Sequence, residues 1–134
     1  MHFTEVSMTI SQQTAQWANE LIADTPLLIP KVLANTLISD EQKARELIME
    51  VVRFVCLCSR SEHVLTPSEI VDSGWHEVIL FTRTYARFCE TKLGRFVHHQ
   101  PSAAHDENQL QYQYTLELYQ QTFGQMQREY WPSP

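Results

Sequence analysis

Hydrophobic residues recur at intervals of three and four along most of this sequence. That spacing places side chains on one face of an α-helix. Runs of strand length with alternating apolar and polar residues are missing, and glycine occurs three times in 134 residues. The pattern predicts an all-α fold, with residues 1–134 forming a single helical domain built as a compact bundle of four to five helices.

The first half of the chain predicts three helices. One spans about residues 9–23 and ends before Pro26. A short helix follows, with Pro30 in its first turn, where a missing N–H costs little; its apolar residues are Val32, Leu33 and Leu37. The third begins at Ser39, which with Gln42 has the spacing of a capping box. It runs to about Ser59 along a buried stripe of Ala44, Leu47, Ile48, Val51, Phe54, Val55 and Cys58.

The second half predicts two long helices. Thr66 and Glu69 have capping-box spacing, with proline at the first helical position, and this helix should reach Leu93. Gly94 is the expected left-handed stop. Gly74 interrupts the helix at a cost of about 1 kcal/mol relative to alanine, which suggests that a neighbour needs the space.

The final predicted helix covers about residues 103–129 and carries the strongest periodic stripe. Its members are Tyr112, Leu116, Tyr119, Phe123, Met126 and Tyr130. Such a stripe indicates either a face packed in the chain's own core or the seam of a homodimer.

Charge and composition exclude several classes of function. Sixteen acidic and ten basic residues give a net charge of −6 without a basic run, which argues against nucleic-acid binding. No apolar stretch approaches the roughly 20 residues of a membrane span. Met1–Glu5 lacks the features of a signal peptide, and three cysteines are an odd number for a disulfide framework. We therefore expect reduced thiols and a cytoplasmic protein.

Polar residues of the types that bind ligands or metals concentrate between residues 72 and 101. Asp72 and His76 are four apart on the predicted helix, so their side chains are in reach of each other. Trp75 lies on the opposite, apolar face, where we expect it to be a buried anchor. Arg83 and Arg87 share the face of His76, and His98 and His99 follow in a loop.

Three interpretations of His76 with His98 or His99 remain open. The first is a hydrogen-bonded structural cluster in which Asp72 fixes an imidazole. The second is a site for zinc or another divalent metal, because imidazole and carboxylate are suitable ligands. The third is an anion site in which Arg83 and Arg87 lie beside His76.

Helix geometry argues against a shared site. At 1.5 Å per residue, His76 lies about 27 Å from Gly94 along a straight helix. Four extended residues beyond Gly94 reach at most about 14 Å. His98 or His99 therefore meets His76 only if the helix is broken between them.

A resemblance appears at these residues. The pattern Asp72-x-x-Trp75-His76, Tyr85, Phe88-Cys89, Gly94-Arg95-Phe96 and His98-His99-x-Pro101 resembles the signature of the glycine-rich domain-containing protein-like family. The resemblance implies a helical domain of the short, stand-alone bacterial type, and it supplies no catalytic residues. Larger plant members carry a glycine-rich tail and are associated with development and stress responses. No such glycine-rich stretch occurs in this sequence.

These observations predict a cytoplasmic binding or adaptor module with a protein partner. Its expected binding residues are Asp72, Trp75, His76, Arg83, Arg87, His98 and His99. The alternative is a metal-dependent enzyme or metal-binding protein using Asp72, His76, His98 and His99 as ligands. No nucleophile–base motif or HExxH sequence occurs, which makes enzymatic activity the weaker interpretation.

Overall fold

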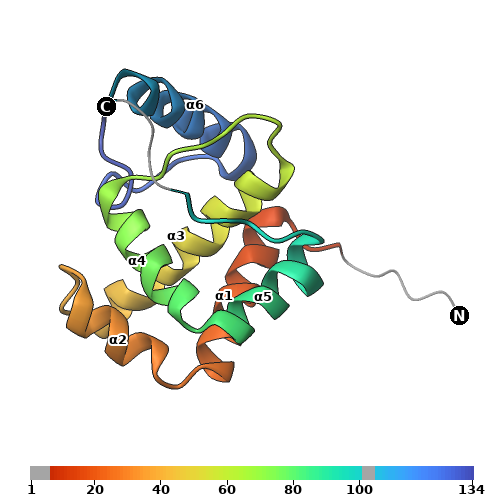
Figure 1. The fold of residues 1–134 in the computed structure, drawn as a ribbon, viewed down its shortest axis with the longest axis vertical. Coiled ribbons are helices and arrows are strands. Elements are labelled where there is room, and N and C mark those ends of the chain that lie inside the picture. Colours follow the sequence, from red (N-terminus) through yellow and green to blue (C-terminus); the bar gives the residue numbers. More distant parts are fainter. Residues whose placement is uncertain (1–6, 101–104) are drawn as a thin grey trace, which may run out of the picture.

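The computed structural model describes residues 7–100 and 105–134, and in these ranges it contains six α-helices and no strand (Figure 1). The helices are α1 Ile10–Asp24, α2 Leu28–Asn35, α3 Glu41–Arg60, α4 Glu69–Leu80, α5 Thr82–Phe88 and α6 His105–Phe123, with a short π-helix, η1, at Cys89–Leu93. The all-helical prediction is confirmed. None of the helices in the described ranges combines the length and hydrophobicity needed to cross a bilayer.

Helix α3 lies at the centre of the molecule and packs against α1, α2, α4 and α6 (Figure 1). Its apolar stripe accounts for this position, because residues at three- and four-residue spacing are buried on several sides at once. The fully buried members include Ala44, Leu47, Ile48, Val51, Phe54 and Val55. The predicted short second helix is present as α2, but it ends at Asn35, and Leu37 is 94% exposed instead of buried.

Two helix starts differ from the predicted capping boxes. Asp40, not Ser39, caps α3, and its carboxylate accepts from the backbone N–H of Lys43. Ser68, not Thr66, caps α4 by accepting from the N–H of Val71. The Ser68 hydroxyl also donates to the carbonyl of Tyr130, so the same side chain joins α4 to the end of the described chain.

At Gly74, α4 packs tightly against two side chains of α3. A Cβ atom placed there would lie 2.8 Å from Leu47 Cγ and 3.1 Å from Val51 Cγ2. The predicted need for space is therefore confirmed. Any larger residue requires α3 and α4 to separate or Leu47 to move.

The predicted long helix from Thr66 to Leu93 is wrong, because it breaks at Phe81. This residue has φ −85° and ψ 70°, and its N–H bonds to Val78 with a spacing of three. The break lets α4 and α5 each bury apolar residues against a different helix. Trp75 packs edge-on against Phe54 of α3, while Phe88 packs edge-on against Trp17 of α1. Packing against two different helices overrides the continuous helical period.

Helix α5 and η1 lead to Gly94, which stops the helix with φ +80°, as predicted. Residues 94–100 then stretch across the face of the molecule above α3 and α4, without helix or strand structure (Figure 1). We call residues 94–100 the crossing segment.

The predicted helix over residues 103–129 is too long at its C-terminal end. Helix α6 ends at Phe123, and Gly124 has φ +87°, a left-handed conformation that stops the helix. The stripe continues into the chain beyond it: Leu116, Tyr119 and Tyr130 are buried inside the same chain. For these three residues, the stripe packs in the chain's own core. The homodimer stays an untested prediction.

Candidate functional site

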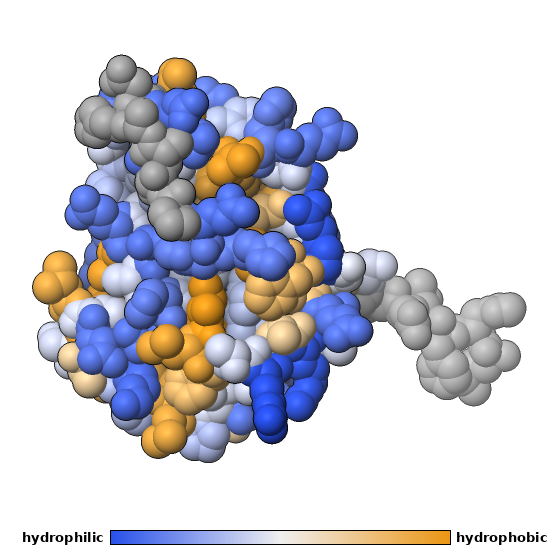
Figure 2. All heavy atoms as spheres, in the orientation of Figure 1, coloured by the Kyte–Doolittle hydropathy of each residue, from blue (hydrophilic) through white to orange (hydrophobic). Residues whose placement is uncertain are grey.

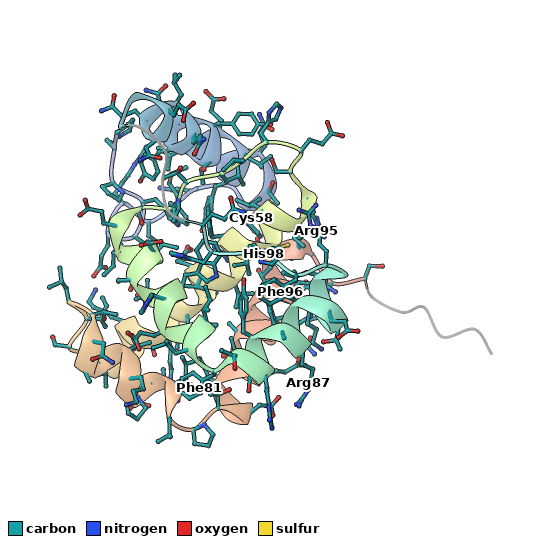
Figure 3. All side chains as sticks on the ribbon, in the orientation of Figure 1. Cys58, Phe81, Arg87, Arg95, Phe96 and His98 are labelled. Carbon is teal, nitrogen blue, oxygen red and sulfur yellow. The ribbon has the colours of Figure 1, made fainter. Side chains whose placement is uncertain are left out.

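A groove of about 430 Å³ lies between the crossing segment and the loop of residues 61–67 that joins α3 to α4. Asp72 and Trp75 of α4 line it from below, and Gln111 of α6 lines it from the other side. Arg95, Phe96 and His98 of the crossing segment lie beside Cys58 at the end of α3 (Figure 3). The groove combines aromatic, charged and amide side chains from four parts of the chain.

An imidazole–carboxylate contact holds the crossing segment on α4. His99 Nε2 lies 2.8 Å from Asp72 Oδ1. The His99 ring also packs edge-on against Trp75, with 4.6 Å between ring centroids. One turn of α4 thus offers the segment a carboxylate and an aromatic face, and His99 uses both.

His76 lies next to this pair, with its ring centroid 6.4 Å from that of His99. Its Nδ1 is 3.9 Å from Oε1 of Glu77, a buried carboxylate that accepts from the Asn35 amide. The two histidines meet because the break at Phe81 turns α5 away and lets the crossing segment return over α4. The straight-helix separation does not apply to a chain broken at Phe81.

A second hydrogen-bonded chain fixes the middle of the crossing segment. Trp75 Nε1–H donates to Tyr85 Oη over 3.1 Å, and the Tyr85 hydroxyl donates to the carbonyl of Val97. Burial raises the pKa of Tyr85 above its ordinary range, so the hydroxyl stays protonated and remains a donor. The predicted burial of Trp75 is confirmed, and its polar edge positions the groove wall.

The four predicted metal ligands do not form one site: Asp72, His76 and His99 lie near one another, but His98 does not join them. His98 turns to Phe96, with 4.6 Å between their ring centroids, and lines the groove instead of facing Asp72. Among the residues that the structure describes, no group of three or more His, Cys, Asp or Glu side chains is arranged to hold a metal ion. The geometry gives the four-ligand site no support.

The predicted anion site is not assembled either. Arg83 and Arg87 lie on α5 beyond the break, and the recorded partners of His76 within the described ranges are Glu77 and His99. Arg87 instead lines a separate cavity of about 230 Å³ with Trp17 and Phe88. Figure 3 shows Arg87 far from Arg95 and His98.

The three cysteines are unpaired. Cys56 and Cys89 are buried, and Cys58 lies partly covered in the groove. Burial raises the pKa of the Cys58 thiol to about 12, against a weaker opposing effect of the Arg95 guanidinium. Cys58 is therefore a neutral, unreactive thiol near neutral pH.

The sequence did not identify two features of the structure. One is Arg95 as a groove-lining cation, since the resemblance included it only as part of a pattern. The other is Glu50, a buried carboxylate that accepts from Tyr119 Oη and, over 3.1 Å, from Trp131 Nε1. Its position gave a signal: Glu50 lies three residues after Leu47 and four before Phe54, inside the apolar stripe of α3.

The family of the chain follows from its sequence. A family model described as UCP032817-like matches residues 23–125, well over half of the chain, so the protein belongs to this family. No curated protein and no solved structure matches it. The matched family's description does not mention a glycine-rich domain, so the resemblance to the glycine-rich domain-containing protein-like family stays a prediction.

Proposed function

We propose that this protein is a binding module that holds a stretched peptide segment of a protein partner in the groove beside the crossing segment. The observation that carries the proposal is the backbone of this wall, in which, among the described residues, only Val97 has recorded partners: its carbonyl accepts from Tyr85, and its backbone bonds to the Cys89 thiol. Within the described ranges, no backbone–backbone hydrogen bond joins residues 95–100 to another part of the chain. Exposed N–H and C=O groups in a stretched segment are what an incoming peptide backbone binds by strand addition.

The side chains support the same class of ligand. Phe96 is 44% exposed on the groove and offers an apolar surface to a peptide side chain. Gln100, Gln111 and His98 add neutral donors and acceptors. In Figure 2, a hydrophilic band runs along the crossing segment with hydrophobic residues above and below it, the mixture found in transient protein interfaces.

The wall is held rigidly, which favours binding. His99 is tied to Asp72 and Val97 to Tyr85, so two points of the segment are fixed before a ligand arrives. A preorganised wall avoids part of the entropy cost of ordering on association. We place this activity in the cytoplasm, a location supported by the three unpaired cysteines.

A peptide library tests the proposal. The probe is a synthetic library of random octapeptides with free carboxyl termini, immobilised through their N-termini. We expect a subset to bind the full-length protein, with about tenfold weaker binding to Phe96→Ala. Leu80→Ala is the matched control, because Leu80 is also exposed and apolar but does not line the groove.

Three outcomes would contradict the proposal. One is the absence of any peptide that binds above background. The second is equal binding by the wild type and Phe96→Ala, when circular dichroism shows that the two proteins have the same helix content. Crosslinking of a bound peptide to α1 or α2 instead of the groove would also contradict it.

A further inference from the structure

Arg95, the second residue of the crossing segment, brings a positive charge to the groove. It makes no ion pair or hydrogen bond with any residue that the structure describes. Several other basic side chains have a partner: Lys43 pairs with Glu129, and Lys92 pairs with Glu20. An unpaired guanidinium in a groove is free to bind an anion from a ligand.

The acidic residues of the groove leave this charge uncompensated. Asp72 is already bonded to His99. Glu62 lines the groove on the opposite wall, but it lies beyond ion-pair distance of Arg95. The groove therefore has an available cation at the Arg95 end and an occupied carboxylate where His99 meets α4.

The spacing along the segment fits a short stretch of peptide. Arg95 and His99 are four residues apart, which is about 13 Å for a stretched chain. Phe96 and His98 lie between them and line the groove (Figure 3). A peptide following the segment covers about four residues between the guanidinium and the Asp72–His99 pair.

We infer that Arg95 binds a carboxylate of the peptide, either its C-terminus or an acidic side chain, and so fixes where the peptide sits in the groove. This inference rests on the proposed peptide-binding function. The guanidinium presents two parallel N–H donors that match the two carboxylate oxygens, a geometry that lysine does not reproduce.

Peptides selected from the library provide the probe. Each is compared with its C-terminally amidated form and with a form in which Asp and Glu are replaced by Asn and Gln. We expect one of the two changes to weaken binding about tenfold, and the change that does so identifies the source of the carboxylate. Arg95→Gln should weaken binding of the parent peptide by a similar factor and leave the neutralised peptide unaffected.

Three further variants sharpen the test. Arg95→Lys should recover only part of the affinity, because it keeps the charge but loses the paired donors. Glu62→Gln should strengthen binding, since it removes a negative charge from the opposite wall. Arg83→Gln removes an arginine on α5 outside the groove and should leave the affinity unchanged.

The inference is overturned if Arg95→Gln changes the dissociation constant less than twofold, or weakens parent and neutralised peptides equally. In either case peptides that still depend on Phe96 would leave the proposed function standing. If no peptide binds at all, the proposed function fails and this inference fails with it.

Discussion

At the scale of single residues, Asp72 and Trp75 on one turn of α4 decide where the crossing segment lies. Asp72 bonds to His99, and Trp75 packs against the same ring. Trp75 also donates to Tyr85, which in turn holds Val97. A small set of side chains therefore converts a stretch without regular structure into a fixed wall.

Replacement of Trp75 should separate its packing from its hydrogen bond. Trp75→Ala removes a buried side chain and should cost about 3–5 kcal/mol of unfolding free energy. Trp75→Phe keeps most of the ring but leaves Tyr85 without its donor, so a smaller loss of about 1–3 kcal/mol is expected. Urea unfolding measures both. A loss below about 1 kcal/mol for the alanine variant would contradict the burial of this residue.

Gly74→Ala should destabilise the protein although alanine favours helix. The propensity gain is about 1 kcal/mol, but the new methyl group would lie 2.8 Å from Leu47 Cγ. Overpacking of this kind costs about 1–3 kcal/mol, which equals or exceeds the gain. Urea unfolding of Gly74→Ala, Leu47→Ala and the double variant forms a mutant cycle. Costs that simply add would show that the two residues do not interact.

At the scale of elements, the sequence predicted helices wherever a stripe and a stop coincide. The end of α1 is one example, because Pro26 follows it. The end of η1 is another, because Gly94 follows it in a left-handed conformation. The break at Phe81 was not predictable, since Leu80 and Phe81 continue the apolar pattern and no glycine or proline marks the site. It depends on α3 and α1 offering separate surfaces to the two halves.

The same break explains why the candidate site was only partly predictable. Asp72 and His76 share a helix turn, so their proximity followed from spacing alone. His99 reaches Asp72 only after α5 turns away and the segment returns, which a helix wheel does not represent. His98 and His99 are adjacent in sequence, yet one lines the groove and the other faces α4.

Gly94 and Gly124 end helices through their left-handed backbone, with φ +80° and +87°. A Cβ at either position meets nothing within 4 Å, so the cost of alanine is one of backbone conformation alone. We expect Gly94→Ala and Gly124→Ala each to lose about 1–2 kcal/mol in thermal or urea unfolding. Asparagine tolerates this conformation better and should restore part of the loss. Unchanged stability in the alanine variants would show that the helix ends adjust freely.

At the scale of the whole molecule, a polar network joins α3 to α6 and the chain beyond it. Glu50 accepts from Tyr119 and Trp131, while Arg53 donates to Tyr119 and lies 5.0 Å from the ring centroid of Phe123. A buried carboxylate is tolerated when donors surround it. The network fixes how α6 sits on α3, and therefore where the Gln111 side of the groove lies.

The protein should lose stability in alkali. Burial raises the pKa of Cys58 to about 12 from 9.0, and it also raises the pKa values of Tyr85 and Tyr119 above 10.0. Above pH 9 the unfolded chain releases protons that the folded chain retains, so rising pH favours unfolding. Each group contributes about 1.4 kcal/mol per pH unit above its unfolded pKa.

Urea unfolding at pH 8 and pH 10.5 tests this expectation. The free energy of unfolding should be nearly constant up to pH 9 and then fall. In Cys58→Ala the fall should begin at the same pH but be shallower, because burial also raises the pKa values of Cys56 and Cys89 from 9.0 and these two thiols remain. An equal free energy at both pH values would contradict the protonated state assigned to these buried groups.

The contacts of Tyr130 and Trp131 also have a consequence for folding kinetics. Tyr130 bonds to Glu46 across 84 residues, and Trp131 bonds to Glu50 across 81. Closing loops of this length costs entropy that most helix contacts do not, so we expect these bonds to form after the folding barrier. Tyr130→Phe should then speed unfolding in stopped-flow measurements and leave the folding rate nearly unchanged. In that case these distant bonds set the lifetime of the folded protein.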